Sequence, residues 1–365
     1  MQSHIGEQVS RMLDRRFIWG VIIVLCISLV LTPIVRTLAI RKGWYAQENE
    51  RTIHHGKIPR IGGVAIYLSF IVGILLTSRL DTKLCGVLAG TTILFIVGFI
   101  DDLYDLSART KLIFQIIAGI VLICFGVQVD VLRLPFGITI DFGIISILFT
   151  LVWIVGITNA INLIDGLDGL AGGMSSVIMM IIALTAILEG KMEIAHLTLL
   201  MVASVFGFLV YNAHPASIFM GDCGSLTLGF FISAISLMGF KSATVMTLAL
   251  PILILFIPIL DTVSAIIRRT LKHKKFSYAD KEHLHHQLMR RFGQTKSVLI
   301  MCTMTACFGI SAFVYMLDKE LGILIMISII FILELFVEKT GMISPKYHPI
   351  LSLLSSVKKL IKPSV

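Results

Sequence analysis

The sequence predicts an all-α polytopic membrane protein of about eleven transmembrane helices, with one short β-hairpin outside the bilayer. Of its 365 residues, 56% are hydrophobic and only 15% are charged, a balance outside the range of soluble domains. Apolar stretches recur nearly from end to end, and between two of them a short segment alternates apolar with other residues. Residues 1–365 are therefore interpreted as a single integral membrane domain.

The apolar stretches follow one another at the length that a membrane span needs. A hydrocarbon core of about 30 Å takes roughly 20 helical residues. The first stretch is too long for a signal-peptide core, and no small-residue cleavage site follows it, so we expect it to be retained. The expected spans lie near residues 17–40, 61–79, 84–100, 111–127, 143–160, 170–188, 194–212, 224–240, 244–268, 297–316 and 320–338.

The segment between the fourth and fifth spans has a different pattern. Residues 129–143, "VDVLRLPFGITIDFG", alternate apolar with other residues around Pro135 and Gly137. Alternation on both sides of a Pro/Gly turn is typical of a β-hairpin. This segment is the expected hairpin.

Cysteine content and charge exclude several classes of protein. The six cysteines are scattered and form no CxxC pair, so neither a disulfide framework nor a zinc site is indicated. A net charge of +9 in a membrane protein indicates basic loops that face anionic lipid. No nucleic-acid partner is expected.

The distribution of Lys and Arg predicts the orientation in the membrane. Eleven spans put the termini on opposite sides, and the side with residues 41–60 collects more than twice as many Lys and Arg as the other. That side is expected to be the cytoplasm, so the N-terminus is outside, residues 339–365 form a cytoplasmic tail and the hairpin is extracytoplasmic. The polar clusters fall on the cytoplasmic side as well. The loops expected to form one site there are residues 41–60, 101–110, 161–169, 213–223 and 269–296.

Two adjacent carboxylates follow the third span. Asp101 and Asp102 are either solvated loop residues or a functional pair, and we favour the second because neighbouring like charges often hold a cation or a substrate proton. Asp105 is expected to form a structural ion pair with Arg109, four residues later on a helix.

The segment "NAINLIDGLDGLAGG" (159–173) repeats a polar residue at every third position. Asn159, Asn162, Asp165 and Asp168 would form a polar ridge on a helix, while the glycines favour a broken helix or a close approach. The segment is either a simple polar loop or a set of oxygen ligands suited to Mg²⁺.

Asp222 stands in "FMGDCGS", between two glycines and just before the eighth span. It either caps that helix or holds a phosphate or metal-phosphate complex at the helix N-terminus.

The last polar cluster, "KEHLHHQLMRR" (281–291), contains His283, His285 and His286. A transition metal is one interpretation; among so many Lys and Arg, contact with an anion such as a diphosphate is favoured.

Asp261 lies inside the ninth span. An acid within the membrane should face the bundle and have a partner, which leaves a packing hydrogen bond and a catalytic role equally open.

These motifs resemble the signature loops of the polyprenyl-phosphate N-acetylhexosamine-1-phosphate transferases. The resemblance covers roughly residues 40–300. Residues 56–70, "GKIPRIGGVAIYLSF", and 259–269, "ILDTVSAIIRR", resemble the undecaprenyl-phosphate GlcNAc-1-phosphate transferases of teichoic-acid and O-antigen synthesis. The phospho-MurNAc-pentapeptide translocases are the nearest neighbours, but the chain lacks their threonine-rich first motif and their three-histidine run.

The resemblance implies a reaction in the bacterial cytoplasmic membrane. A sugar-1-phosphate moves from a cytosolic UDP-sugar, here UDP-GlcNAc, to undecaprenyl phosphate, with release of UMP and a requirement for Mg²⁺ or Mn²⁺. Asp222 and Asn162 match the family's metal ligands, and Asp101 or Asp102 would take or orient the lipid phosphate's proton. The residues implied in substrate binding are Asn159, Asp165, Asp168, Asn212, His283, His285, His286, Lys57 and Arg60.

A cation-coupled transporter is the main alternative from another class. Its coupling acids should lie near mid-span, whereas here they gather at span ends on one face, and no internal repeat is evident. The sequence leaves open which polymer is started, the length of the lipid, GlcNAc against GalNAc, single against double displacement, and whether the protein forms a homodimer.

Overall fold

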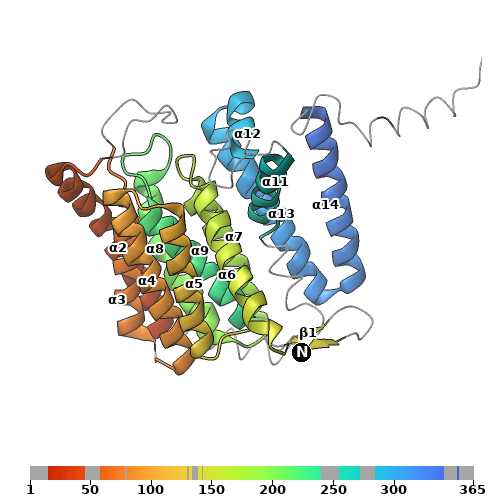
Figure 1. The fold of residues 1–365 in the computed structure, drawn as a ribbon, viewed down its shortest axis with the longest axis horizontal. Coiled ribbons are helices and arrows are strands. Elements are labelled where there is room, and N and C mark those ends of the chain that lie inside the picture. Colours follow the sequence, from red (N-terminus) through yellow and green to blue (C-terminus); the bar gives the residue numbers. More distant parts are fainter. Residues whose placement is uncertain are drawn as a thin grey trace, which may run out of the picture.

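The structure is a computed structural model built almost wholly of helices (Figure 1). It describes residues 15–45, 58–78, 80–129, 131–133, 139–141, 143–239, 255–271, 284–340 and Ser352. The helices are α2 (Arg15–Lys42), α3 (Gly63–Thr77), α4 (Thr82–Tyr104), α5 (Ala108–Cys124), α6 (Ile145–Ile164), α7 (Leu170–Leu188), α8 (Met192–Asn212), α9 (Asp222–Gly239), α11 (Phe256–Leu271), α12 (Leu284–Phe292), α13 (Gln294–Leu317) and α14 (Lys319–Thr340).

Several of these helices have the length and composition of membrane spans. Six of them are long and apolar enough to cross a bilayer, namely α2, α4, α6, α7, α8 and α13, and α3 and α9 are shorter apolar helices. The chain is thus a helical, multi-pass membrane protein, as predicted. The count of eleven spans stays a prediction, and the first part of the ninth expected span, residues 244–254, lies outside the described residues.

Local signals set where two of the helices begin. Asp81 precedes α4, and its Oδ1 accepts the N–H of Leu84 at 2.7 Å. Ser107 precedes α5, and its Oγ accepts the N–H of Thr110 at 3.2 Å. Each side chain satisfies one of the N–H groups that the first turn of a helix leaves without a partner.

Two strands pair between α5 and α6. The antiparallel strands β1 (Val131–Arg133) and β2 (Thr139–Asp141) place Val131 opposite Asp141. They lie at the end of the bundle opposite to α12 (Figure 1). Residues 134–138, which would form the turn, lie outside the described part of the chain, and the side of the membrane on which the strands lie stays a prediction.

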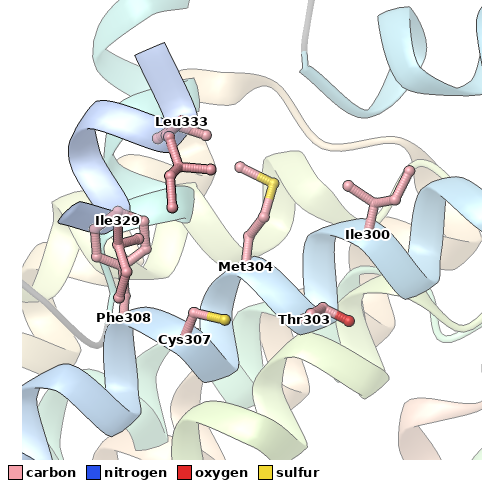
Figure 2. A pocket seen from close by; sticks show the side chains of 8 residues that line it. Ile300, Thr303, Met304, Cys307, Phe308, Ile329 and Leu333 are labelled. Carbon is pink, nitrogen blue, oxygen red and sulfur yellow. The ribbon is translucent and has the colours of Figure 1, made fainter. Parts of the chain in front are cut away.

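An apolar cavity of about 240 Å³ lies between α13 and α14 (Figure 2). Its lining residues are Ile300, Thr303, Met304, Cys307, Phe308, Ile329, Ile332 and Leu333. Thr303 alone among them carries a hydroxyl, and none is charged. A sugar nucleotide needs charged and hydrogen-bonding partners, which this cavity does not supply.

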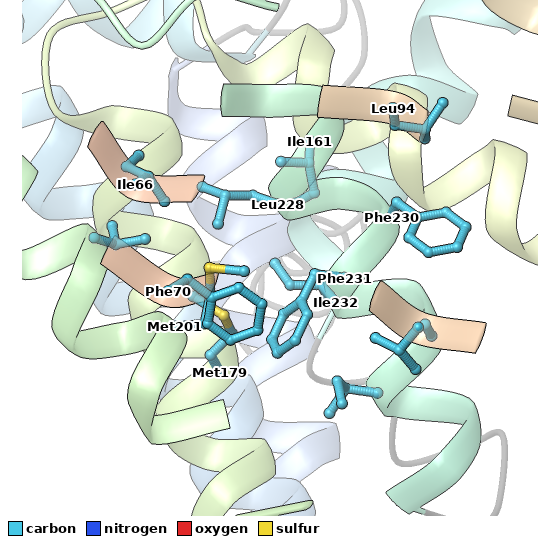
Figure 3. Packing of buried hydrophobic residues seen from close by; sticks show 14 of the residues in the cluster. Ile66, Phe70, Leu94, Ile161, Met179, Met201, Leu228, Phe230, Phe231 and Ile232 are labelled. Carbon is cyan, nitrogen blue, oxygen red and sulfur yellow. The ribbon is translucent and has the colours of Figure 1, made fainter. Parts of the chain in front are cut away.

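Helix α9 lies inside the bundle. It packs against α3, α4, α6, α7 and α8, and Phe230 and Phe231 on it are fully buried. Figure 3 shows these rings among apolar side chains of the surrounding helices. Because α9 is apolar on all sides, burial on all sides is the arrangement its sequence favours. The consequence is that Asp222, its first residue, is held well inside the protein and is only 6% exposed.

A second apolar cluster joins the C-terminal helices to the loop between α6 and α7. Its buried residues are Ile164, Leu167, Leu170, Met174, Ile257, Leu288, Met301 and Phe308. They come from α6, α7, α11, α12, α13 and the α6–α7 loop. This cluster therefore places α12 beside the segment that carries Asp165 and Asp168.

Candidate active site

The C-terminal turn of α4 meets the N-terminus of α9 through Asp102. The Oδ1 atom of Asp102 accepts the N–H of Asp222 at 2.8 Å, and its Oδ2 accepts the N–H of Cys223 at 2.9 Å. The side chain of Asp102 is 0% exposed. A carboxylate at a helix N-terminus satisfies N–H groups without a helical partner and interacts favourably with the helix dipole. Asp102 therefore fixes the position from which the Asp222 side chain extends.

Two cations meet the carboxylate of Asp222. Lys111 Nζ lies 2.8 Å from Asp222 Oδ2 and 3.1 Å from Asp101 Oδ2. On the other side, an Nη atom of Arg60 lies 3.3 Å from Asp222 Oδ1. The structure thus brings three of the predicted acids, Asp101, Asp102 and Asp222, into one cluster with two basic residues.

Arg60 is the most exposed member of this cluster, at 43%, and its Nε lies 3.7 Å from Asp102 Oδ1. Burial opposes its charge, but the carboxylates of Asp222 and Asp102 outweigh that effect and raise the pKa of Arg60 above its ordinary value. The segment that carries Arg60 is hydrogen-bonded to the residues just before α9, since the N–H of Phe219 donates to the carbonyl of Pro59 at 2.8 Å.

Glycines allow these backbones to approach. A Cβ on Gly98, one turn before Asp102, would lie 2.4 Å from the carbonyl oxygen of Asp222. A Cβ on Gly63 would lie 2.2 Å from the backbone nitrogen of Gly224. Side chains at these two positions would push α3 and α4 away from α9, so the glycines are part of what builds the site.

A pair of side-chain amides, one turn after Lys111, joins α5 to α6 and so orients the helix that carries Lys111. Gln115 Nε2 donates to Asn159 Oδ1 at 3.2 Å, and Asn159 Nδ2 donates to Gln115 Oε1 at 2.7 Å. Lys111 and Gln115 are four residues apart, so they lie on the same helix face. In this structure the predicted substrate contact Asn159 joins α6 to α5.

Asn162 connects the end of α6 to α9. Its Nδ2 donates to Ser225 Oγ at 2.8 Å, one turn after Asp222. The amide nitrogen is therefore directed at Ser225, which leaves the amide oxygen as the group of Asn162 suited to a cation.

The two loops that follow α6 and α8 are tied together by Asp168 and Asn212. Asp168 Oδ2 lies 2.8 Å from His214 Nδ1 and accepts the N–H of Ala216 at 3.1 Å. Asn212 Oδ1 accepts the N–H of Gly169 at 3.1 Å, while its Nδ2 donates to the carbonyl of Ile218 at 2.9 Å. Both side chains are buried and hold the loops in register.

Asp165 lies in the same region, between α6 and α7. Withdrawal of its carboxyl from water raises the pKa of Asp165 to about 7; the carboxylates of Asp222 and Asp168 act in the same direction, and Arg60 opposes them. The electrostatic field of the cluster thus extends from Asp222 to this loop.

The other predicted residues fall in different places. Lys57 and His283 lie outside the described residues. His285 and His286 lie on α12, where His286 is partly buried. The predicted ion pair of Asp105 with Arg109 is wrong, because α4 ends at Tyr104 with Asp105 in the left-handed conformation (φ 49°) and Arg109 belongs to the next helix.

Sequence reasoning missed Lys111, Gln115 and His214. A signal for Lys111 was present, since a lysine within an apolar helix needs a partner inside the protein, and the nearby acids could have supplied it. Gln115 and His214 are recognised only by their partners, Asn159 and Asp168, which are 44 and 46 residues away in the sequence.

The site contains oxygen-bearing side chains of the kind that bind Mg²⁺ together with substrate and water. Among the residues that the structure describes, no group of three His, Cys, Asp or Glu side chains could hold a metal ion alone. Mg²⁺ is usually bound by one or two carboxylates together with substrate phosphates and water. Asp222 has carboxylate oxygens and Asn162 an amide oxygen, which are ligand types of Mg²⁺. In this structure both oxygens of Asp222 are paired with Arg60 and Lys111, which substrate phosphates could draw away.

A helical membrane protein with carboxylates and basic residues gathered at helix ends has the features of an integral-membrane transferase that acts on phosphate-linked substrates. The model of the family described as glycosyl transferase family 4 matches residues 84–240, the segment that holds Asp101, Lys111 and Asp222. The chain belongs to this family, within the polyprenyl-phosphate hexosamine-1-phosphate transferase superfamily.

Three curated relatives are similar over most of their length. A probable undecaprenyl-phosphate N-acetylglucosaminyl 1-phosphate transferase of Bacillus subtilis (strain 168) is 42% identical over 350 residues, which cover 93% of this chain and 97% of the relative. A decaprenyl-phosphate N-acetylglucosaminephosphotransferase of Mycolicibacterium smegmatis is 32% identical, over 70% of this chain and 71% of the relative. A phospho-N-acetylmuramoyl-pentapeptide-transferase of Alkaliphilus metalliredigens is 32% identical, over 78% and 92%.

Proposed function

We propose that the protein transfers GlcNAc-1-phosphate from UDP-GlcNAc to undecaprenyl phosphate and releases UMP. The observation that carries this proposal is the cluster of Asp101, Asp102 and Asp222 with Lys111 and Arg60. The 42% identity to the Bacillus subtilis relative, over nearly the whole chain, supports the choice of sugar and lipid. Family membership favours a transferase over a cation-coupled transporter.

The chemistry accounts for the two basic residues. An oxygen of the lipid phosphate attacks the β-phosphorus of UDP-GlcNAc and forms a new P–O bond. The bond from the β-phosphorus to the bridging oxygen breaks, and UMP leaves with the electron pair. Both reactants are anions, and negative charge develops on the leaving phosphate. Lys111 and Arg60, which bind carboxylates in the structure, would bind phosphate oxygens during the reaction and stabilise that charge.

We propose that Asp222 and Asn162 hold Mg²⁺, or Mn²⁺ in its place. The ion would supply further positive charge to the diphosphate when bound. Ser225 accepts a hydrogen bond from the Asn162 amide, and Asp102 accepts the backbone N–H of Asp222. Each proposed ligand is therefore oriented by a hydrogen bond to a neighbouring residue.

Asp101 and Asp102 receive different roles. Both oxygens of Asp102 bond backbone N–H groups of α9 and its side chain has no exposed surface, which favours a positioning role. Asp101 accepts the N–H of Leu106 with Oδ1 and bonds Lys111 through Oδ2, so Oδ2 is released if Lys111 moves to a phosphate. We therefore assign the lipid phosphate's proton to Asp101.

The rest of the predicted pocket divides in a similar way. Asn159 and Asn212 each bond other protein groups with both ends of the amide, so their proposed role is to shape the pocket. Asp165 and the histidines of α12 remain the candidates for direct contact with the nucleotide sugar, and His214, beside Asp168, is added to them.

We propose an active site that faces the cytoplasm of a bacterium, in a protein of eleven spans with the N-terminus outside. UDP-sugars are water-soluble and the lipid phosphate is anchored in the bilayer, so the two meet at the cytoplasmic surface. The lipid-linked product would start a surface glycopolymer of the teichoic-acid or O-antigen kind. Cysteines placed in residues 41–60 and 269–296 should react with impermeant thiol reagents from the cytoplasmic side only; labelling from outside intact cells would contradict this orientation.

The activity is tested with purified protein in nanodiscs that contain undecaprenyl phosphate. UMP release from UDP-GlcNAc should require both Mg²⁺ and the lipid, and it should exceed release from UDP-GalNAc and UDP-MurNAc-pentapeptide. The similarity to the pentapeptide-transferase of Alkaliphilus metalliredigens makes the last substrate the second candidate. Equal or faster turnover of it would move the protein into that branch, and folded protein that turns over none of the three would contradict the proposal.

A further inference from the structure

A buried carboxylate on α11 lies outside the cluster described above. Asp261 on α11 is 4% exposed, and its Oδ1 accepts the backbone N–H of Leu284 at 2.9 Å. Leu284 is the first residue of α12, 23 positions later in the sequence. The carboxylate of one helix thus binds the N-terminus of another, at the point where that helix has an N–H group without a helical partner.

Helix α12 depends on such outside contacts. It has nine residues, which is too short for a stable helix on its own, and its first turn contains no acidic residue. Arg290 and Arg291 in its last turn suit the helix dipole but do not fix where the helix lies. The N–H groups at its start need an acceptor, and Asp261 supplies one from α11.

A second contact fixes the rotation of α12 about its axis. Leu288, one turn after Leu284, is fully buried in the cluster that contains Ile164 and Leu167. Those two residues flank Asp165 in the loop after α6. By the helical period, His286 and Arg290 lie on the face of α12 away from Leu284 and Leu288.

We propose that Asp261 is a positioning residue that holds the histidine-bearing helix α12 at the edge of the active site. Asp261 binds the first residue of α12, and Leu288 packs against the loop that carries Asp165, so together they fix the position of the helix backbone that bears the histidines. The part of this inference that concerns the substrate rests on the proposed function. The part that concerns the attachment of α12 does not.

The attachment is tested by hydrogen exchange of the protein in nanodiscs without substrate. Asp261→Ala removes the acceptor and should speed exchange of the α12 amides by about 2- to 30-fold, the range expected for a lost helix cap. Asp261→Asn keeps an acceptor oxygen of nearly the same shape and should exchange like the wild type. Asp318→Ala is a matched control, because Asp318 Oδ1 accepts the N–H of Leu321 at the start of α14, and its loss should speed exchange there and leave α12 unchanged.

The hydrogen bond between Leu284 and Asp261 can also be removed from the side of its donor, the backbone N–H of Leu284. Leu284→Pro removes the N–H at the first helical position, where proline is tolerated, and Leu284→Ala keeps the N–H while it shortens the side chain. If the bond holds α12, the effects of Asp261→Ala and Leu284→Pro on exchange should not add in the double variant. Additive effects would overturn the proposal. If Asp261→Ala folds poorly, the comparison of Leu284→Pro with Leu284→Ala still decides, because only the proline variant removes the N–H and should speed exchange of α12; equal exchange in the two would overturn the proposal.

Kinetics separate positioning from chemistry. Asp261→Ala should raise the KM for UDP-GlcNAc by about 10-fold, with a smaller change in kcat, and Asp261→Asn should restore most of the loss. If Asp261→Asn loses as much kcat as Asp261→Ala while exchange of α12 stays normal in both, Asp261 takes part in the reaction and the positioning role is wrong. If the wild type turns over no UDP-sugar, the proposed function fails, and the exchange experiment still decides the attachment of α12.

Discussion

Two helices that carry candidate site residues each begin at a carboxylate that extends from another helix, but the two helices differ in how they are packed. At the start of α9, Asp102 binds two N–H groups with both oxygens, and α9 is buried on all sides in a bundle tightened by glycines. At the start of α12, Asp261 binds the N–H of Leu284, and α12 packs through one face of nine residues. The contrast predicts that α12 opens at a lower free-energy cost than the N-terminus of α9 around Asp222.

The largest expected effect separates the paired aspartates. Asp101→Asn should lower turnover by about 10²- to 10⁴-fold if Asp101 handles the lipid phosphate's proton. Binding of Mn²⁺, measured by electron paramagnetic resonance, should stay close to wild type. Raising the pH should restore part of the turnover because it ionises the phosphate without help. An unchanged pH profile together with weakened Mn²⁺ binding would assign Asp101 to the metal site.

The neighbouring variant should fail for a different reason. Asp102→Asn places an amide NH₂ against one of two backbone N–H groups, so the start of α9 should shift and carry Asp222 with it. We expect Mn²⁺ affinity to fall by about 10- to 100-fold, as for residues that support metal ligands. Asp222→Asn is the reference for direct loss of a ligand, and extra Mg²⁺ should restore part of the activity of both variants. Normal Mn²⁺ affinity in Asp102→Asn would contradict the positioning role.

Tight packing around α9 is tested by a single methyl group. Gly98→Ala places a Cβ against the backbone of Asp222 and should cost about 1 to 3 kcal/mol of stability, seen as a lower Tm. Gly156→Ala is the control, since a Cβ there would meet no atom within 4 Å. Equal Tm values for the two variants would show that α4 and α9 can move apart without loss of stability, and would contradict the tight packing proposed for this contact.

The smallest expected effect on global stability is at α12. Leu288→Ala should detach α12 locally and speed its hydrogen exchange, while the Tm changes less than in Gly98→Ala, because a short peripheral helix can open without unfolding the bundle. Leu288→Met, which conserves most of the volume, should behave like the wild type. A fall in Tm as large as that of Gly98→Ala would mean that both regions unfold as one unit, which would remove the contrast.

The sequence predicts the class of the fold and much of the membership of the site. Apolar length identifies the helices, and the polar motifs at their ends identify Asp101, Asp102 and Asp222, which the structure brings together. The sequence does not predict which side chains bond to one another across helices, because those contacts depend on how the helices pack. The acceptance of two α9 N–H groups by Asp102 and the amide pair of Gln115 with Asn159 join residues 44 or more positions apart. The Asp105–Arg109 pair failed because the spacing rule assumes one continuous helix, and the chain turns at Asp105.

The burial of Cys223 has a practical consequence for chemical labelling. This cysteine follows Asp222, is 0% exposed, and its Sγ donates to the carbonyl oxygen of Met220 at 3.5 Å. Cys26 and Cys124, in contrast, are exposed on the outer surface of apolar helices. Cys223 can therefore be kept in a background for cysteine scanning as a shielded internal reporter, which reacts with a thiol reagent only once α9 has separated from its neighbours.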